Sequence, residues 1–359
     1  MSPHPASPHP TPATPPLVPT VLVTGATGFL GGHIMAALGE SGAVVIAAAR
    51  DASRIPSWFA GETRIGDLTD PAYRRDVVQG VDVVIHAGTW SSFWGHAKAE
   101  RELFLEPTLD LIDQSVAAGA QRFIAASSVA LGSPSSRGEV VDDDEAAVAR
   151  AFWPHHAAMV AVERRQRDVA AAGSRTRMVS LRLGHFVGAG NSMGLVSAIV
   201  PRLRTRQVPW VNHGRAHLPL VSGADMGRAF ALAAAVPSDS LSPFEAINIV
   251  GPAQPTVREV FGHIAAKAGV PSPAYSVPLG AAHGFGALME AMHPILPGRA
   301  PFLTRSLVHV GEDWHMSTTK AASILGFAPR DDWRDAVEAQ LEARRPGGFA
   351  WPELAQRME

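Results

Sequence analysis

Three glycines near the start of the chain have the spacing of a chemical site. Residues 24–31 read T-G-A-T-G-F-L-G, so glycine recurs at every third position. Because glycine lacks a Cβ atom, such a turn lets the backbone approach a bound group, and the helix that follows aims its N-terminal N–H groups at an anion. This spacing is typical of turns that hold the pyrophosphate of a dinucleotide. The candidate cofactor-binding residues here are Thr24, Gly25, Thr27, Gly28, Phe29, Leu30 and Gly31.

The segments on both sides of this turn are those that the motif requires. Residues 21–23 are apolar, and Ile34, Met35 and Leu38 follow at helical spacing. The same patterns predict strands at 21–24, 43–49, 82–86, 122–127 and 178–183, and helices at 29–39, 70–79, 98–118 and 155–172. This alternation predicts an α/β fold, a doubly wound parallel Rossmann sheet whose ligand lies at the carboxyl ends of the strands.

Composition divides the chain into four parts. Residues 1–19 alternate proline with small or polar residues and predict a disordered tail, and residues 20–187 form the dinucleotide-binding domain. Residues 188–345 predict a smaller C-terminal α/β region that binds substrate, in which we expect a strand near 246–250, a helix near 256–268 and a helical stretch at 318–342. Residues 346–359 form a second tail.

Charge and cysteine content exclude several other functions. The 359 residues carry 31 basic and 33 acidic side chains, a formal net charge of −2, and no basic run that would bind nucleic acid or an anionic membrane. We find no signal peptide and no apolar run of about 20 residues, so we expect a soluble protein. The absence of cysteine excludes disulfides and thiolate-bound metals and fits the cytoplasm, and we predict no metal ligand among the other residues. These features favour a small-molecule ligand.

The end of the second predicted strand bears on the choice of dinucleotide. Arg50 follows this strand and suits a ribose 2′-phosphate, whereas the neighbouring Asp51 would suit a 2′-hydroxyl. We therefore expect NADP(H), with NAD(H) as the alternative. Asp67 and Leu68 are predicted to lie beside the adenine. Ala87 and Gly88, at the end of the third strand, are small enough to let the backbone approach the dinucleotide.

Together these segments resemble the extended short-chain dehydrogenase/reductase superfamily, in particular the branch of nucleotide-sugar epimerases, dehydratases and 3β-hydroxysteroid-dehydrogenase-like enzymes. The resemblance covers nearly the whole chain. Its matches lie at residues 24–31, 66–70, 123–132, 181–188, 221–228 and 320–329. It implies a dinucleotide-dependent enzyme, and because dimers through paired helices are frequent in this superfamily, it also implies a homodimer.

The chain departs from the superfamily at the motif that carries the chemistry. A Tyr-x-x-x-Lys motif normally moves the proton, but its pattern falls on residues 154–163 and places His155 at the tyrosine and Met159 at the lysine. Histidine has an unperturbed pKa near 6.5 and is an acid or base at neutral pH without a lysine. The resemblance also implies a serine that orients the substrate. Alignment from the strand start selects Ser128, and alignment from Gly132 selects Ser127, so we take Ser128 and His155 as the catalytic candidates.

Aromatic residues are predicted to form the substrate side. Trp90, Phe93 and Trp94 follow the third strand, interleaved with small polar residues, and His185 with Phe186 forms the opposite wall by analogy with the superfamily. Aromatic walls suit an apolar substrate better than a sugar nucleotide.

Three functions fit these features. The first is an NADP(H)-dependent oxidoreductase that acts on an apolar carbonyl or alcohol, with His155 in place of the tyrosine. The second is a non-redox isomerase, cyclase or lyase that uses His155 and Ser128 as acid–base groups. The third is a nucleotide sensor without turnover. The fold does not distinguish them.

Overall fold

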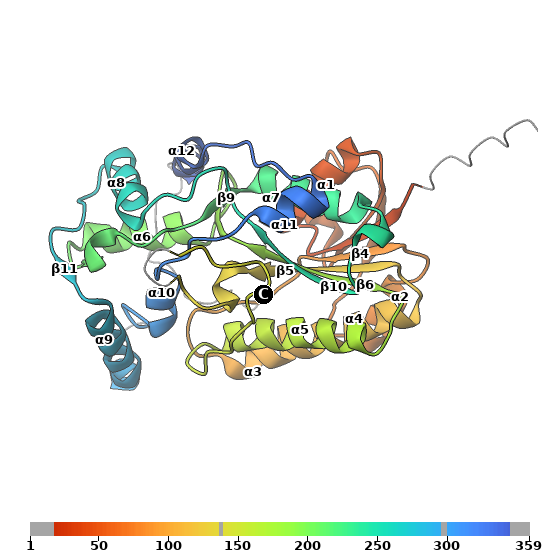
Figure 1. Ribbon diagram of the computed structural model, residues 1–359, viewed down its shortest axis with the longest axis horizontal. Helices are drawn as coiled ribbons and strands as arrows, with labels where there is room; N and C mark the ends of the chain where they lie inside the picture. Colours follow the sequence, from red (N-terminus) through yellow and green to blue (C-terminus); the bar gives the residue numbers. More distant parts are fainter. Residues whose placement is uncertain (1–17, 136–138, 296–299, 345–359) are drawn as a thin grey trace, which may run out of the picture.

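The core of the protein is a sheet of seven parallel strands. The computed structural model describes residues 18–135, 139–295 and 300–344. Figure 1 shows the sheet through the middle of the molecule, with the strand order β10-β6-β5-β4-β1-β2-β3. Its strands are β1 (Thr20–Thr24), β2 (Val44–Ala49), β3 (Glu62–Ile65), β4 (Val83–His86), β5 (Arg122–Ser128), β6 (Arg177–Leu183) and β10 (Phe244–Ile249). The predicted tail at 346–359, and residues 1–17 of the predicted N-terminal tail, lie outside the described residues.

The central strands are buried on both faces, which explains their nearly continuous apolar sequences. In β1, Val21, Leu22 and Val23 are fully buried. Register places Thr24 of β1 opposite His86 of β4, so that the carboxyl ends of these parallel strands meet at one edge. The α/β class with a doubly wound parallel sheet is confirmed.

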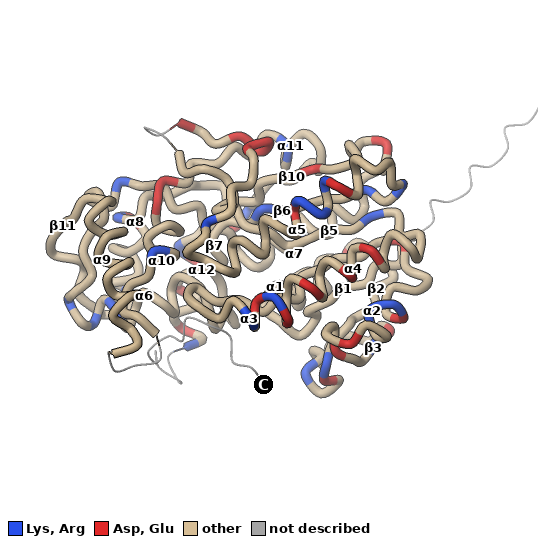
Figure 2. Tube along the Cα trace, turned by 90° about the horizontal axis from the view of Figure 1, so that it is seen from below, with Lys and Arg blue, Asp and Glu red and all other residues tan. Residues whose placement is uncertain are grey.

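Helices cover the two faces of this sheet, as Figure 1 shows. On one face, α1 (Phe29–Glu40), α7 (Gly223–Ala235) and α11 (Thr319–Leu325) bury residues against the strands. On the other face lie α2 (Pro71–Val77), α4 (Glu106–Ala117) and α5 (Pro154–Ala171). Figure 2 shows acidic and basic residues interspersed along the outer helices, so these helices carry both signs of charge.

A smaller layer stands beyond the carboxyl edge of the sheet, at the left of Figure 1. Its helices are α6 (Leu195–Arg204), α8 (Val257–Ala268), α9 (Leu279–Met292), α10 (Arg305–His309) and α12 (Trp333–Arg344). Two short parallel pairs join them, β7 (His185–Val187) with β9 (Leu220–Ser222), and β8 (Trp210–Val211) with β11 (Ser276–Val277). Short 3₁₀ turns lie at Ala52–Arg54, Val129–Leu131, Asn212–Gly214, Ser238–Ser240 and His293–Ile295.

The structure differs from the expected division of the chain. The strand predicted near 246–250 is β10, which pairs with β6 in the main sheet rather than joining the second layer. α7 and α11 also pack on the main sheet. Strand type is a local property, but a strand's partner is not, which is why composition placed this strand in the wrong layer.

Two predicted helices are interrupted. The stretch at 318–342 forms α11 and α12, because Gly326 ends α11 with a left-handed φ of 63°. The helix predicted at 98–118 consists of α3 (Ala97–Glu100), the π-helical turn η2 (Arg101–Leu105) and α4. Pro107 has no N–H to donate to the preceding turn, which accounts for the wider π turn before it.

Candidate functional site

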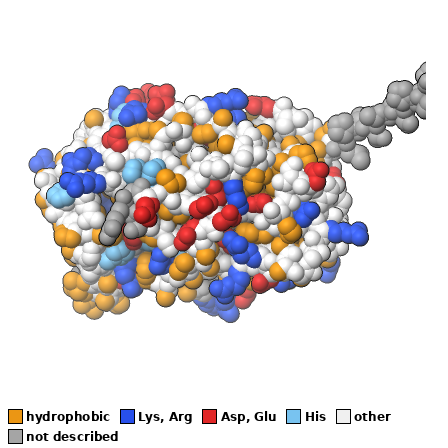
Figure 3. Space-filling view, in the orientation of Figure 1, with side chains coloured by type: hydrophobic (Ala, Val, Ile, Leu, Met, Phe, Trp, Pro, Cys, Tyr) orange, Lys and Arg blue, Asp and Glu red, His pale blue; other side chains and the backbone are white. Residues whose placement is uncertain are grey.

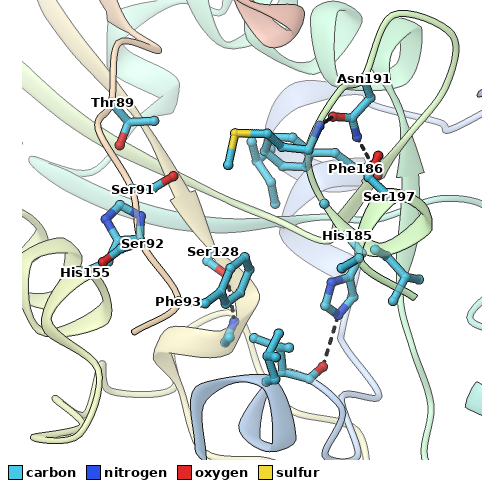
Figure 4. Close-up of a pocket in the computed structure, with 18 of the residues that line it drawn as sticks. Thr89, Ser91, Ser92, Phe93, Ser128, His155, His185, Phe186, Asn191 and Ser197 are labelled. Carbon is cyan, nitrogen blue, oxygen red and sulfur yellow. Dashed lines mark hydrogen bonds between the residues drawn. The ribbon is translucent and has the colours of Figure 1, made fainter. Parts of the chain in front are cut away.

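One large cavity runs along the carboxyl edge of the sheet, between the sheet and the smaller layer. Its volume is about 1940 Å³, and its lining extends from the glycine turn at Gly25 to Met289 on α9. A pocket for one drug-sized ligand usually measures about 300–1,000 Å³, so this cavity has room for a dinucleotide and a substrate together. Figure 4 shows side chains from several elements pointing into it, among them Ser128, His155 and His185.

The glycine turn has the shape that was predicted from its spacing. Gly25 has a φ of +69°, and a Cβ atom there would lie 2.6 Å from the nitrogen of Gly88. A Cβ atom on Gly31 would lie 2.1 Å from the carbonyl oxygen of Gly25, so both positions exclude side chains. The first turn of α1 holds no acidic residue, which leaves its N–H groups available to an anion. All the predicted residues of this turn line the cavity, namely Thr24, Gly25, Thr27, Gly28, Phe29, Leu30 and Gly31.

A buried histidine ties the neighbouring strand ends together. Nδ1 of His86 lies 2.8 Å from Oγ1 of Thr24, and its Nε2 lies 3.0 Å from Oγ1 of Thr108. Burial lowers the pKa of His86 to about 4, so the ring is neutral at physiological pH. Ala87 and Gly88, which follow it, line the cavity. His86 therefore holds the edge in place with both nitrogens.

The end of β2 presents two arginines to the cavity. Arg50 and Arg54 are both among its lining residues. Asp51 is not, because its carboxylate accepts hydrogen bonds from the N–H and Oγ of Ser53, at 2.8 and 2.7 Å, and caps the next turn. The Ser53 hydroxyl lowers the pKa of Asp51. Asp67 and Leu68 line the same end of the cavity.

Both candidate serines lie at the end of β5 and line the cavity. Oγ of Ser128 accepts a hydrogen bond from the N–H of Ala130 at 3.2 Å. Oγ of Ser127 is buried and makes no hydrogen bond within the described part of the chain, and the same holds for Nε1 of Trp90. Both residues line the cavity, but these two polar atoms are themselves buried and unpaired among the described residues.

His155 lies in the first turn of α5 and lines the cavity. Its Nδ1 lies 2.9 Å from Oε2 of Glu100, which is only 1% exposed. Oε1 of Glu100 accepts hydrogen bonds from the N–H and the Oγ of Ser92, at 2.8 and 2.9 Å. An imidazole held by a carboxylate on one nitrogen can take or give a proton on the other. Sequence analysis missed Glu100, because no spacing in the chain connects it with His155.

The adjacent histidine has a different environment. His156 is fully buried, and its Nε2 donates a hydrogen bond to the carbonyl oxygen of Ala130 at 2.8 Å. Desolvation lowers its pKa to about 4. His156 is not a lining residue, whereas Met159, one turn after His155, is. Of the two histidines at the start of α5, only His155 reaches the cavity.

Four of the five predicted substrate residues line the cavity, namely Trp90, Phe93, His185 and Phe186. Trp94 does not. Its ring packs edge-on against His293, with ring centroids 4.4 Å apart. Nε2 of His185 donates to the carbonyl oxygen of Val310 at 3.1 Å, and burial lowers the pKa of this histidine to about 4. Further apolar lining, which was not among the predicted substrate residues, comes from Trp153, Ile199, Phe261, Phe285, Met289 and Leu307.

The apolar lining continues onto the surface. Phe285 and Leu288 of α9 are 46% and 52% exposed. Figure 3 shows apolar side chains gathered at the lower left, where Figure 1 places α9, while charges of both signs lie over the rest of this face. Within residues 18–135, 139–295 and 300–344, no helix is long and apolar enough to cross a membrane. The same residues contain no group of three or more side chains placed to hold a metal ion.

A doubly wound sheet with this glycine turn and a serine at the end of β5 defines a protein of the extended short-chain dehydrogenase/reductase type. The model of the NAD dependent epimerase/dehydratase family matches residues 21–249. The chain belongs to that family, whose members depend on a nicotinamide dinucleotide.

Named relatives and solved structures resemble the chain over most of its length. A 2-alkyl-3-oxoalkanoate reductase of Stenotrophomonas maltophilia is 28% identical over 319 residues, 86% of this chain and 94% of the relative. A 4-hydroxy-2-methyl-3-oxo-4-farnesyl-3,4-dihydroquinoline-1-oxide ketoreductase of Stigmatella aurantiaca is 23% identical, over 93% of this chain and 99% of the relative. The crystal structure of gox2253 has the same fold, with a TM-score of 0.73 and 22% identity, over 92% of this chain and 99% of that one.

Proposed function

We propose that the protein is an NADP(H)-dependent reductase of a large, mostly apolar carbonyl compound, with His155 as the proton donor. The observation that carries this proposal is the shared cavity. The glycine turn, Ser128, His155 and an apolar wall all line the same space, so a dinucleotide and an apolar substrate would meet beside an acid–base group.

The residues of the cavity fit the dinucleotide. The backbone at Gly25 and Gly31 leaves no room for a Cβ atom, and α1 begins without an acidic residue. Arg50 and Arg54 line the end of the cavity next to β2, while Asp51 is occupied by Ser53. Two cationic donors favour a 2′-phosphate over a 2′-hydroxyl, which supports NADP(H) over NAD(H). A bound reduced nicotinamide supplies the hydride that reduces the carbonyl carbon.

Side chains of the cavity orient the carbonyl oxygen of the substrate and supply its proton. Oγ of Ser128 accepts the Ala130 N–H, so its own O–H is left to donate to the carbonyl oxygen of the substrate. His155 then gives a proton to that oxygen as the carbon receives the hydride, and the carbonyl becomes an alcohol. The reaction needs no further reactant, and the proton on His155 is replaced from water.

The lining also supports the choice of substrate class. Phe93, Phe186 and Trp153 provide aromatic surface near the catalytic candidates, and Phe285 and Met289 extend the apolar wall to α9. Both relatives described above are named as reductases of keto compounds, one carrying alkyl groups and one a farnesyl group. An apolar ketone is therefore a better first substrate than a sugar nucleotide.

The test combines nucleotide binding with turnover. We expect binding of NADPH, and oxidation of NADPH on addition of a 2-alkyl-3-oxoalkanoate but not of a nucleoside-diphosphate sugar. His155→Ala should lower kcat by about 10²–10⁴-fold and leave NADPH affinity nearly unchanged, because the residue is assigned to proton transfer. The matched control is His263→Ala on α8, whose side chain packs on Trp333 outside the cavity and should retain full activity.

Each contrary outcome selects another function. A protein that binds neither nucleotide is not a reductase. Product formation without NADPH oxidation would select the isomerase, cyclase or lyase. Binding without turnover, with activity only in the double variant His155→Tyr, Met159→Lys, would select the nucleotide sensor. Comparison of Ser128→Ala with Ser127→Ala identifies the serine that orients the substrate.

A further inference from the structure

We propose that Glu100 is a positioning residue for His155, which it holds as the Nδ1-protonated tautomer. The proposal rests on the proposed function of His155. The superfamily motif has a lysine that supports the proton-moving residue, and this chain has Met159 at that position. The proposal assigns the supporting role to a buried carboxylate on α3.

Contacts from separate parts of the chain fix this pair. Oε1 of Glu100 takes both donors of Ser92, and Oε2 takes Nδ1 of His155. Nε1 of Trp153 donates to the carbonyl oxygen of Ser92 at 2.7 Å, which holds the loop that presents these donors. The ring of Phe104 lies 5.3 Å from that of His155, between centroids. Because a buried carboxylate is costly unless it is paired, this arrangement has one stable orientation.

The pairing determines which nitrogen does the chemistry. An ionised carboxylate only accepts hydrogen bonds, so the proton between Glu100 and His155 resides on Nδ1. Nε2 makes no hydrogen bond within the described part of the chain, and is the nitrogen that would exchange a proton with the substrate.

The other ionisable groups near the pair, apart from Arg150, have partners of their own. His156 on the same helix donates to the carbonyl oxygen of Ala130, with His309 beside it and its Nε2 3.3 Å from the same oxygen. The positive charge of Arg150 adds to the effect of desolvation in lowering the pKa of His156. Lys98, Arg101 and Glu102 form ion pairs at the surface beyond Glu100, and Arg165 of α5 pairs with Asp113 of α4. Glu100 is thus the one carboxylate that bonds His155 among the described residues.

Glu100→Gln gives a sharp test, because Ser92 dictates how the amide must lie. The two Ser92 donors keep the amide oxygen at the Oε1 position, so the amide N–H₂ faces Nδ1 of His155 and donates to it. The variant should reverse the tautomer. We expect kcat to fall about 100-fold while the apparent affinity for NADPH stays constant, and the ring nitrogen shifts of His155 to change to those of the Nε2-protonated form.

Two further variants separate positioning from folding. Glu100→Asp keeps the carboxylate and should recover part of the lost kcat. Asp313→Asn makes the same chemical change in another carboxylate–histidine pair outside the cavity, where Asp313 lies 2.8 Å from Nδ1 of His217, and should leave kcat unchanged.

A measurement on the unaltered protein does not depend on any Glu100 variant folding. Histidine labelled with ¹⁵N gives ring nitrogen shifts that distinguish the tautomers, and the His155 signals are assigned by their loss in His155→Gln. An Nε2-protonated neutral ring in the unaltered protein would overturn the proposal, as would full kcat in a folded Glu100→Gln. If His155→Ala itself is fully active, the proposed function fails first.

Discussion

The two halves of the cavity are built in different ways. On the dinucleotide side the shape comes from backbone, as at Gly25 and Gly31, and the residues that make it are neighbours in the sequence. On the catalytic side it comes from side chains that are distant in the sequence, since His155 and Glu100 are 55 positions apart and His185 and Val310 are 125 apart. Binding therefore depends on space for the backbone, whereas chemistry depends on particular pairs of side chains.

The largest effect that this comparison predicts comes from one methyl group. Gly31→Ala places a Cβ atom 2.1 Å from the carbonyl oxygen of Gly25, so the turn must open. We expect the affinity for NADPH to fall by about 100-fold or more, because the displaced backbone is what approaches the pyrophosphate. Isothermal titration with NADPH measures the loss.

The neighbouring glycine provides the matched control. A Cβ atom on Gly32 meets nothing within 4 Å, so Gly32→Ala should bind NADPH normally and gain a little helix stability. Equal NADPH affinity in the two variants would show that space for the backbone does not govern binding. The two halves of the cavity would then not differ in the way described above.

The second effect is a loss of folding stability at low pH. It arises at the strand edge on the dinucleotide side of the cavity. His86 has a folded-state pKa of about 4, against about 6.5 in an unfolded chain. Between these values the unfolded state binds a proton that the folded state does not, so stability is lost as the pH falls from about 6.5 to about 4. The loss is about 3 kcal/mol for this one group, since each pKa unit corresponds to about 1.4 kcal/mol.

Urea unfolding at pH 7 and at pH 4.5 tests this effect. His86→Gln keeps a polar side chain between Thr24 and Thr108 but cannot take up the proton. The difference in unfolding free energy between the two pH values should therefore be smaller in the variant, by about 2–3 kcal/mol. An unchanged difference would mean that His86 is not the group that titrates on unfolding.

The same contrast explains what the sequence could and could not predict. The glycine turn and the strands β1, β2, β4, β5 and β6 were predicted because their signals are local. The place of β10 in the main sheet was missed, because nothing in residues 244–249 encodes β6 as a partner. Glu100 was missed for a similar reason. It lies in a stretch that predicted only a helix, and only the fold brings it to His155.

Trp94 is a residue that was predicted to line the cavity and does not. It was predicted to lie beside Trp90 and Phe93, which do line the cavity. Trp94 directly follows Phe93 in the chain, but this position does not bring its side chain to the cavity. The loop turns its ring toward His293 instead. Spacing of 3.6 or 2 residues predicts which face a side chain takes in a helix or strand, but a loop has no such period.

The smallest effect is expected at Arg50, because here a side chain rather than the backbone acts on the dinucleotide side of the cavity. Arg50→Ala removes a cationic donor from the end of the cavity beside β2 and leaves the glycine turn intact. If Arg50 contacts a 2′-phosphate, NADPH affinity should fall about tenfold while NADH affinity stays the same, because a hydrogen bond to a charged group contributes about 1.5–3 kcal/mol and Arg54 remains. Titration of both nucleotides measures the ratio, with Arg75→Ala on the exposed face of α2 as the control. An equal loss for NADPH and NADH would remove the reason to favour NADP(H), and would leave the dinucleotide side as a site made by backbone alone.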